Sequence, residues 1–442
     1  MTEMKDSGVA WINTIPKKWK LKKIKYALKN RNENNNPIRS KNILSLTAKQ
    51  GVIPLEEKEG GGNKPKEDYS AYKLAYPNDI VMNSMNVLSG SVGLSKYFGC
   101  VSPVYYMLRP IDEKDDVRYY NYIFQTTVFQ RSLLGLGNGI LMKESDNGKL
   151  NTIRMRIPLD KLGNLLIPVP DSSIQRKIAD YLDSIIPNID MLLADIEKQI
   201  ETLEEYKKSI ITEAVTKGLD PDVEMKDSGI SYIGNIPKHW KVTNLKYLGK
   251  CQNGISKGGE YFGNGFPFVS YGDVYKNYSI PQNVDGLIMS TKTEQNIYSV
   301  KYGDVFFTRT SETIEEIGFA STCLKSIDNS VFAGFLIRFR PTSSDLIPEF
   351  SKFYFRSNIH RKFFVKEMNL VTRASLSQNL LGRLPVLLPP LCEQQIIAKN
   401  LEKKCAEIDG AIEEKKEQLE TLEQYKKSLI YEYVTGKKEH SC

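Results

Sequence analysis

The chain contains the same order of short motifs twice, about half a chain apart. The sequence MKDSG at residues 4–8 returns at residues 225–229, and an Ile-Pro-Lys-x-Trp-Lys block at residues 15–20 returns at residues 236–241. A later block, ETLEEYKKS at residues 201–209, returns as ETLEQYKKS at residues 420–428. The repeating unit of about 220 residues is domain-sized and far longer than a solenoid repeat. Such a duplication predicts a pseudo-twofold molecule, which suits a target with two parts.

The composition is typical of a globular protein with room for two or more domains. The chain has 442 residues, 40% of them hydrophobic and 26% charged. It has no apolar run long enough to span a bilayer, and its first residues lack the apolar core of a secretory signal. The six cysteines form no Cys-x-x-Cys pair and there are three histidines, which argues against a zinc site. We therefore expect a cytoplasmic protein without bound metal and without a membrane partner.

Positive charge is concentrated outside two acidic stretches. The net charge is +8, whereas residues 173–216 carry −4 and residues 393–436 carry −3, which leaves +15 on the rest of the chain. This excess lies in the two long regions that do not repeat, as expected of a protein that binds a polyanion. A solvated basic surface is the alternative that charge alone leaves open.

Residues 174–216 have the apolar spacing of a coiled-coil helix. Two neighbouring rows of residues recur every seven positions. One row is Ile189, Ile196, Leu203 and Ile210, and the other is Leu192, Gln199 and Tyr206. Leu193 and Ile200 widen this apolar stripe. The second copy repeats these rows as Ile408, Lys415, Leu422 and Leu429, and as Ala411, Gln418 and Tyr425. Each stripe is the obvious partner of the other, so we predict an antiparallel coiled coil. Gln199 and Gln418 occupy equivalent seam positions, where a buried polar pair would help to set the register.

Pro187 lies inside the first of these helices, where its counterpart in the second copy is Ala406. Proline removes a backbone donor and clashes with the preceding turn. We therefore expect a kink or break near Ile186, with a short helix before it and a long helix from Asn188. The long helix would run roughly 40 Å at about 1.5 Å per residue, a length close to one turn of DNA.

The regions from about residue 19 to 168 and from about 240 to 389 are predicted to be α+β domains. Short β-rich runs occur at residues 80–82, 105–108, 305–307 and 335–339, between glycine-rich loops, and helices are expected around residues 117–134 and 348–365. We divide the chain into a first globular domain with its repeat head (1–170), a helical spacer (171–224), a second globular domain (225–389) and a second helical spacer (390–442).

A weaker match links the two globular regions. Residues 72–81 align with residues 298–306, so that Asp79 and Asp304 each precede a β-rich run. Most other residues of the two regions differ. The fold is thus expected to be shared, with a constant frame and a varied surface.

This order of elements resembles the specificity (S) subunit of Type I restriction–modification enzymes over essentially the whole chain. The resemblance is carried by the heads at Gly8 and Gly229 with their Ile-Pro-x-x-Trp ends, the elements at Asp79 and Asp304, the proline-rich helix starts, and the Leu-Glu-x-Tyr-Lys-Lys-Ser tails. It implies two target-recognition domains, each reading one half of a bipartite, asymmetric DNA site, with helices that set the distance between half-sites.

The resemblance also implies partners. Two methyltransferase (M) subunits would dock on the helices, and two restriction (R) subunits would join for cleavage. S-adenosylmethionine, ATP and Mg are expected on these partner subunits and not on this chain.

Sequence motifs for methyl transfer and for ATP hydrolysis are missing. The one Pro-Pro pair, at residues 389–390, is flanked by leucines, so the chain lacks the Asp/Asn-Pro-Pro-Tyr/Phe tetrapeptide that grips a flipped base. The glycines at residues 135–139 follow a helix-like stretch and not a strand, which favours a loop near DNA over a cofactor loop. A non-catalytic DNA-recognition subunit fits best. A self-contained methyltransferase or nuclease with unfamiliar motifs, and a coiled-coil adaptor that binds proteins, remain open.

Side chains that read DNA should lie in the loops that differ between the two copies. Arginine and lysine suit phosphates and guanine, whereas asparagine and glutamine suit adenine. The candidates in the first domain are Lys49, Gln50, Asn83, Ser84, Asn86, Arg131 and Asn138. The candidates in the second domain are Lys257, Arg309, Thr310, Ser311, Arg373, Ser375 and Gln378. For each one, an ordinary polar surface residue is the alternative.

The Tyr-Lys-Lys blocks in the helix tails are candidates for docking partner subunits, one block per repeat. We predict that Tyr206 and Tyr425 complete the coiled-coil seam. The four lysines that follow them are predicted to face a partner or solvent: Lys207, Lys208, Lys426 and Lys427.

Overall fold

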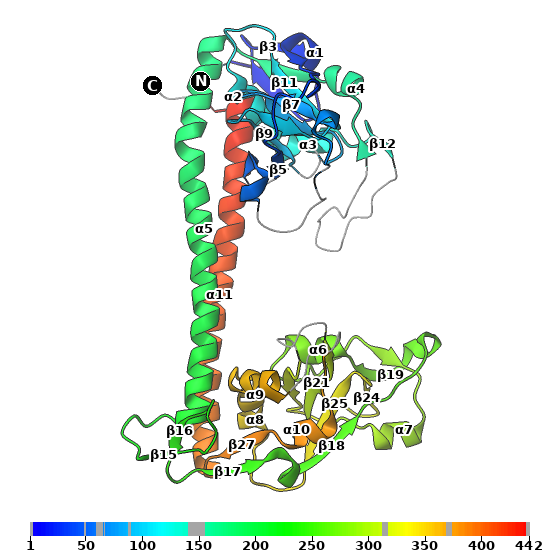
Figure 1. Cartoon of the computed structure of the whole chain (residues 1–442), viewed down its shortest axis with the longest axis vertical. Coiled ribbons are helices and arrows are strands. Elements are labelled where there is room, and N and C mark those ends of the chain that lie inside the picture. The colour runs from blue at the N-terminus through cyan, green and yellow to red at the C-terminus, as the bar shows by residue number, and fades with distance from the viewer. Residues whose placement is uncertain are drawn as a thin grey trace. The chain divides into compact units, whose positions relative to one another are not determined.

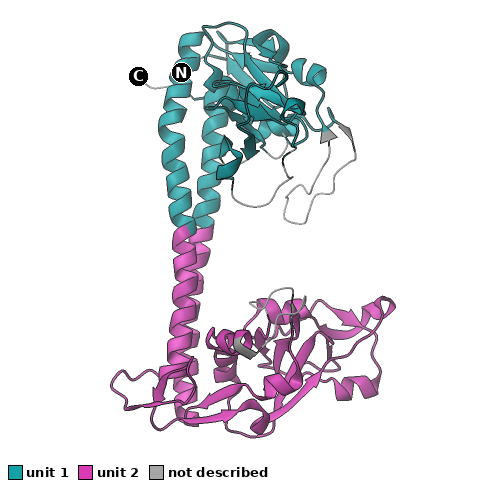
Figure 2. Ribbon diagram, viewed as in Figure 1, with its two compact units in different colours: residues 1–197, 417–442 teal, residues 198–416 magenta. Residues whose placement is uncertain are grey.

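The computed structural model describes residues 3–47, 50–58, 65, 67–86, 90–139, 155–311, 317–367 and 374–438. The chain forms two compact units, unit 1 with residues 1–197 and 417–442 and unit 2 with residues 198–416 (Figure 2). Each unit contains one part of helix α5 (Ser172–Lys217), one part of helix α11 (Leu391–Val434) and a globular part. The two helices lie within the segments that the sequence assigns to spacers, and the exact segment boundaries stay a prediction.

Unit 1 is built around a four-stranded antiparallel sheet in the order β4-β11-β8-β9, with the two-stranded pairs β1-β2, β3-β14, β5-β6, β7-β10 and β12-β13 (Figure 1). The strands are β1 (Met4–Asp6), β2 (Thr14–Pro16), β3 (Lys20–Lys23), β4 (Leu28–Asn30), β5 (Leu44–Thr47), β6 (Gly51–Pro54), β7 (Lys73–Ala75), β8 (Ile80–Asn83), β9 (Val92–Leu94), β10 (Gly99–Val101), β11 (Tyr105–Pro110), β12 (Asn138–Gly139), β13 (Met155–Arg156) and β14 (Leu166–Val169). Its helices are α1 (Ile24–Ala27), η1 (Leu55–Glu57), η2 (Tyr69–Ala71), α2 (Val117–Gln125), α3 (Thr127–Ser132) and α4 (Leu159–Gly163).

Unit 2 repeats this central sheet in the order β18-β25-β21-β23, and adds a three-stranded sheet β20-β19-β24 with the pairs β15-β16, β17-β27 and β22-β26. The strands are β15 (Met225–Asp227), β16 (Asn235–Pro237), β17 (Lys241–Asn244), β18 (Gly249–Asn253), β19 (Phe262–Val269), β20 (Leu287–Ile288), β21 (Val305–Thr308), β22 (Thr310–Ser311), β23 (Ala320–Thr322), β24 (Val331–Phe332), β25 (Leu336–Pro341), β26 (Ala374–Ser375) and β27 (Pro385–Leu388). Its helices are η4 (Leu245–Tyr247), η5 (Gly259–Tyr261), α6 (Tyr271–Lys276), α7 (Lys292–Ile297), α8 (Pro348–Arg356), α9 (Ile359–Glu367) and α10 (Gln378–Gly382).

The central strands form because short apolar runs are buried on both faces. All four residues of β8 and all four of β21 are buried, and each strand lies between two neighbours. In both units the predicted helical stretch is two helices, because the backbone becomes extended after the first of them, at Thr126 in unit 1 and at Ser357 in unit 2. The mixed α+β fold and the shared frame predicted from the sequence are thereby confirmed.

Helices α5 and α11 run antiparallel in each unit (Figure 1). In unit 1 the rings of Tyr181 and Tyr433 are 4.5 Å apart, and farther along α5 Asp190 pairs with Lys426, which comes earlier in α11. In unit 2 Lys207 pairs with Asp409 at 2.6 Å. As the residue number rises along α5, the residue number of the partner in α11 falls. This confirms the predicted antiparallel coiled coil.

The expected helix break near Ile186 is wrong, because α5 continues through Pro187. A proline weakens the hydrogen bonds of the turn before it. The side chain of Asn188 donates to the backbone oxygen of Ser184 at 3.0 Å, and Ile189 is buried in the core of unit 1. A side-chain hydrogen bond and tertiary packing therefore hold the helix together at the proline.

The predicted second row of the seam is also wrong. Leu192, Gln199 and Tyr206 are exposed along α5, as are Gln418 and Tyr425 along α11. The row that turns inward lies one residue later and contains Leu193, Ile200 and Lys207 in α5, and Ile412, Leu419 and Lys426 in α11. The two glutamines are therefore not a buried pair, and the inward polar residues are lysines.

None of the helices in the described residues combines the length and the apolar character needed to cross a bilayer.

Candidate nucleic-acid interface

A buried aspartate marks the start of the central strand in each unit. Asp304 in unit 2 is fully buried and accepts two hydrogen bonds from Arg340, at 2.6 Å to Nε and 2.5 Å to Nη2. Its Oδ2 also accepts the backbone N–H of Lys301 at 2.8 Å. This arrangement fixes the turn before β21 and thereby the direction in which the chain leaves that strand.

Asp79 holds the same place in unit 1 with weaker partners. Its Oδ2 accepts the backbone N–H of Tyr76 at 3.0 Å and lies 3.4 Å from Arg31 Nε, while its Oδ1 lies 3.7 Å from Arg109 Nε. Burial raises the pKa of Asp79, although the hydrogen bond from Tyr76 and the charge of Arg31 oppose the shift. The two sequence-matched aspartates are thus parts of the frame and not DNA contacts.

The structure aligns the residues after these strands more closely than the sequence does. Leu376 donates its N–H to the backbone oxygen of Arg309 at 2.8 Å, and Ile157 donates to Ser84 at 2.9 Å. Ser84 is therefore the structural counterpart of Arg309.

Three of the predicted DNA-reading residues of unit 2, Arg309, Thr310 and Ser375, lie together although Ser375 is far from the other two in sequence; we call them the Arg309 cluster. Strands β22 and β26 pair so that Thr310 stands opposite Ser375, and Arg309 directly precedes β22. Arg309 is half-buried, and its guanidinium is 3.5 Å from the backbone oxygen of Gly334. A guanidinium beside two hydroxyls offers donors for guanine edges or phosphates and adaptable donors or acceptors for other bases.

The other described candidates of unit 2 lie elsewhere. The Lys257 ammonium is engaged, at 2.7 Å from Glu294 Oε2 and 2.9 Å from the backbone oxygen of Met289. The hydrogen bond from Lys257 is the main reason that the pKa of Glu294 is lowered. Gln378 is exposed at the first residue of α10.

Two candidates of unit 1 lie inside the domain. Asn83 and Ser84 are buried; Asn83 accepts the N–H of Met85 at 3.0 Å, and Ser84 donates to the backbone oxygen of Val104 at 2.7 Å. These side chains brace the turn after β8. Their burial does not favour contact of either side chain with a base, and such contact stays a prediction.

The exposed candidates of unit 1 are Gln50, Asn86 and Arg131. Arg156 was missed by the sequence reasoning: it is exposed in β13, opposite Asn138 in β12, and it precedes Ile157 as Ser375 precedes Leu376. Its positive charge adds to burial in lowering the pKa of Lys73. The spacing of 219 residues from Ser375 to Arg156, the same as that of the tail repeats, is the signal that could have found it.

Lys49 and Arg373 lie outside the described residues, and the backbones but not the side chains of Asn138 and Ser311 are described. The role of these four residues stays a prediction.

The Tyr-Lys-Lys blocks are arranged alike in both units. Tyr206 and Tyr425 are exposed, so the prediction that they complete the seam is wrong. The first lysine of each block turns inward to an aspartate of the other helix, Lys207 to Asp409 and Lys426 to Asp190. Lys208 and Lys427 are exposed. The tyrosine and the second lysine of each block therefore form its outward face.

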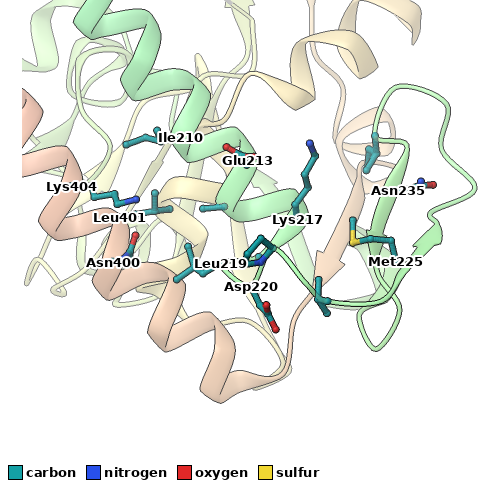
Figure 3. A pocket seen from close by; sticks show the side chains of 15 residues that line it. Ile210, Glu213, Lys217, Leu219, Asp220, Met225, Asn235, Asn400, Leu401 and Lys404 are labelled. Atoms are coloured by element: carbon teal, nitrogen blue, oxygen red, sulfur yellow. The ribbon is translucent and has the colours of Figure 1, made fainter.

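A hollow of about 600 Å³ lies in unit 2 where α5 ends and the chain turns toward β15 (Figure 3). Side chains of both charges line it, including Glu213, Lys217, Asp220 and Lys404. Within the described residues no cluster of three His, Cys, Asp or Glu side chains could hold a metal ion.

Residues 237–421 match the family model of the Type I restriction modification DNA specificity domain. This part of the chain therefore resembles a Type I DNA specificity domain. The match covers most of unit 2, including the β21 and β25 strands and the Arg309 cluster. The resemblance to specificity subunits stated from the sequence is thereby confirmed.

Curated relatives carry the same description. The chain is 30% identical over 292 residues to the Type I restriction enzyme MjaVIII specificity subunit of Methanocaldococcus jannaschii, a match of 62% of each chain. It is 26% identical over 251 residues to the Type I restriction enzyme EcoKI specificity subunit of Escherichia coli, over 55% of this chain and 51% of that one. The matched part of this chain thus spans between half and two thirds of these relatives.

The fold of this chain also matches that of a solved structure. A chain from a structure of a type I R-M system, studied for complex assembly and conformational transition, has a TM-score of 0.69 over 96% of this chain and 99% of that one. The two sequences are 13% identical, so the likeness concerns the fold.

Proposed function

We propose that this chain is the non-catalytic DNA sequence-specificity subunit of a Type I restriction–modification complex. Each globular part reads one half of a bipartite, asymmetric site, and the paired helices set the spacing between the half-sites. The observation that carries this proposal is the combination of one frame with two different surfaces. The buried aspartates Asp79 and Asp304 repeat. The residue directly after the strand that each aspartate precedes differs, being a half-buried Arg309 in unit 2 and a buried Ser84 in unit 1.

The DNA-reading surface of unit 2 is proposed to contain Arg309, Thr310 and Ser375. In unit 1 the exposed side chains Asn86, Arg131 and Arg156 are the stronger candidates, because Asn83 and Ser84 are occupied inside the domain. A changed set of side chains on the same frame would read a different sequence, and the target would then be asymmetric.

The partners are proposed to be double-stranded DNA, two methyltransferase subunits and two restriction subunits. Tyr206 with Lys208, and Tyr425 with Lys427, offer two equivalent outward faces on the helices for the methyltransferase subunits. Lys207 and Lys426 instead serve the helix pair itself. S-adenosylmethionine, ATP and Mg belong to the partner subunits.

Purified full-length chain tests the class of function directly. We expect no methyl transfer with S-adenosylmethionine and no ATP hydrolysis, together with DNA binding that weakens as salt rises, because phosphate contacts release counterions. Methylation by the chain alone would show a self-contained enzyme. Salt-insensitive or absent DNA binding, even with the methyltransferase subunits present, would favour a protein-interaction adaptor.

A reconstituted complex with the methyltransferase subunits tests the proposed surface. Arg309→Ala should weaken DNA binding by about ten- to a hundredfold, which corresponds to the loss of one bidentate base contact. Lys301→Ala removes an exposed lysine of the same unit and is the matched control. Asn83→Ala should leave the methylated sequence unchanged. An Arg309 variant that binds as the Lys301 control does would exclude this surface.

A further inference from the structure

A tight turn in unit 2 presents a phenylalanine to solvent beside the Arg309 cluster. Residues 333–336 join β24 to β25, and the side chain of Phe335 at the tip is 65% exposed. A phenylalanine buries a large apolar area when it contacts a partner, so such exposure is costly in a domain where most aromatic residues are buried or half-buried.

The turn is held rigidly by backbone hydrogen bonds on all sides. Leu336 donates to Ala333 at 3.0 Å, Ala333 donates to Val269 at 3.0 Å, and Arg309 donates to the backbone oxygen of Phe335 at 2.9 Å. A side chain at Gly334 would clash with the hydroxyl of Ser256. The exposure of Phe335 is therefore built into the fold and does not come from a loose loop.

The position of the turn places Phe335 among the proposed base-reading groups. Arg309 contacts the turn twice, through its backbone N–H to Phe335 and through its guanidinium to Gly334. Thr310 follows Arg309 and pairs with Ser375. The residue with the exposed ring is thus hydrogen-bonded through its backbone to Arg309, the first residue of the Arg309 cluster.

The same turn exists in unit 1 with a different tip. Tyr105 donates to Ser102 at 3.0 Å, as Leu336 does to Ala333, and Ser84 contacts the oxygen of Val104 where Arg309 contacts that of Phe335. Val104 is half-buried, whereas Phe335 is mostly exposed. The frame of the turn is therefore shared, and the large aromatic tip belongs to unit 2.

We propose that Phe335 makes an apolar contact with a base in the half-site that unit 2 reads. This inference rests on the proposed function of the chain as a DNA-specificity subunit. The ring could obtain that contact from the face of a base at an opened step, where apolar side chains act as wedges, or from the methyl group of thymine in the major groove. Arg309 beside it would anchor the same stretch of DNA.

The test uses the full-length chain in complex with its methyltransferase subunits, and duplexes carrying the sequence that this complex enriches from a random pool. Phe335→Ala should weaken binding by about tenfold or more at fixed salt, since stacking on one base contributes about 1–3 kcal/mol. Phe335→Leu should keep part of the affinity. Tyr247→Ala is the matched control, because Tyr247 is an equally exposed aromatic residue of unit 2, at 69%.

Two probes distinguish the source of the contact. A duplex with 2-aminopurine in the half-site of unit 2 should brighten with the wild-type complex and not with Phe335→Ala if the ring opens a base step. Replacement of each thymine by uracil should weaken the wild type, and not the Ala variant, if the ring contacts a methyl group.

Equal DNA affinities for the Phe335 and Tyr247 variants would overturn the inference while leaving the proposed function intact. Loss of the methyltransferase subunits from Phe335→Ala, with unchanged affinity of the chain for DNA, would also overturn it and make Phe335 a protein contact. A wild-type complex that enriches no sequence would instead contradict the proposed function itself.

Discussion

The turns that follow the two buried aspartates show how one frame carries two surfaces. In unit 2 Asp304 accepts hydrogen bonds from Nε and Nη2 of Arg340, and the chain then presents Arg309 and the exposed Phe335. In unit 1 Asp79 is divided between two more distant arginines, and the chain then buries Ser84 behind a half-buried Val104. Two backbone hydrogen bonds recur in both turns, Leu336 to Ala333 like Tyr105 to Ser102, and Leu376 to Arg309 like Ile157 to Ser84, while the outward side chains differ.

This difference separates residues that hold the domain from residues that can vary with the target. Substitutions in the frame should change stability in one unit and leave recognition chemistry alone. Substitutions of the outward side chains in these turns, such as Arg309 and Phe335, should change DNA recognition and leave stability nearly unchanged. Substitutions in the frame are expected to have the largest effects on stability.

Loss of the arginine partner should affect unit 2 far more than unit 1. Arg340→Ala leaves the buried Asp304 without its bidentate partner and should destabilise unit 2 by about 3 kcal/mol. Arg109→Ala should cost less than about 1 kcal/mol, because Arg31 and the N–H of Tyr76 still serve Asp79. Urea unfolding followed by hydrogen exchange of peptides from each unit measures both. Equal losses in the two units would contradict the comparison.

Acid should weaken unit 2 through a histidine that has no equivalent in the described part of unit 1. His360 lies in α9 and is buried, and burial lowers its pKa to about 3. The positive charge of Arg361 lowers the pKa further, whereas the hydrogen bond with the backbone oxygen of Tyr354 opposes the shift. The unfolded chain therefore binds more protons than the folded one between about pH 6.5 and pH 3, and stability falls as the pH falls through that window.

The expected loss is about 1.4 kcal/mol per pH unit below pH 6.5, or about 2 kcal/mol at pH 5. His360→Gln keeps a donor for Tyr354 and should remove this part of the pH dependence, whereas His239→Gln, at an exposed position, should not. Urea unfolding at pH 7 and pH 5 gives the answer. If the His360 variant and the wild type lose the same stability, His360 is not the acid-sensitive group.

The two ion pairs of the helices should have equal and small effects, because the duplication makes them equivalent. Lys207→Ala and Lys426→Ala should each cost about 0.5–1 kcal/mol, and less at high salt, since their aspartate partners are more than half exposed. A double variant with Lys207→Asp and Asp409→Lys should recover most of the loss. A Lys207 variant as stable as the wild type at low salt would show that this pair is not part of the frame.

The frame was predictable from the sequence because it depends on local patterns. Heptad spacing predicted both long helices, and apolar runs predicted β8, β11, β21 and β25. The continuity of α5 at Pro187 was missed because it depends on Asn188 and on packing against other parts of unit 1. The inward lysines were missed because their partners, Asp409 and Asp190, are about 200 residues away or more.

The candidate surface was predictable only in part. Arg309, Thr310 and Ser375 were found from their residue types, and the structure brings them together through the pairing of β22 with β26. Arg156 and Phe335 were missed because their exposure follows from strand register and from the turn, which residue types do not reveal. Asn83 was chosen for its amide, yet that amide is used inside the domain.

Sequencing of methylated bases in DNA treated with the reconstituted complex tests the central claim most directly. The wild-type complex should methylate one asymmetric sequence of two half-sites with a fixed gap. Arg309→Ala should relax the bases of one half-site and leave the other half-site and the gap unchanged, because only unit 2 is altered. A change in both half-sites or in the gap, or an unchanged sequence with unchanged affinity, would contradict the account.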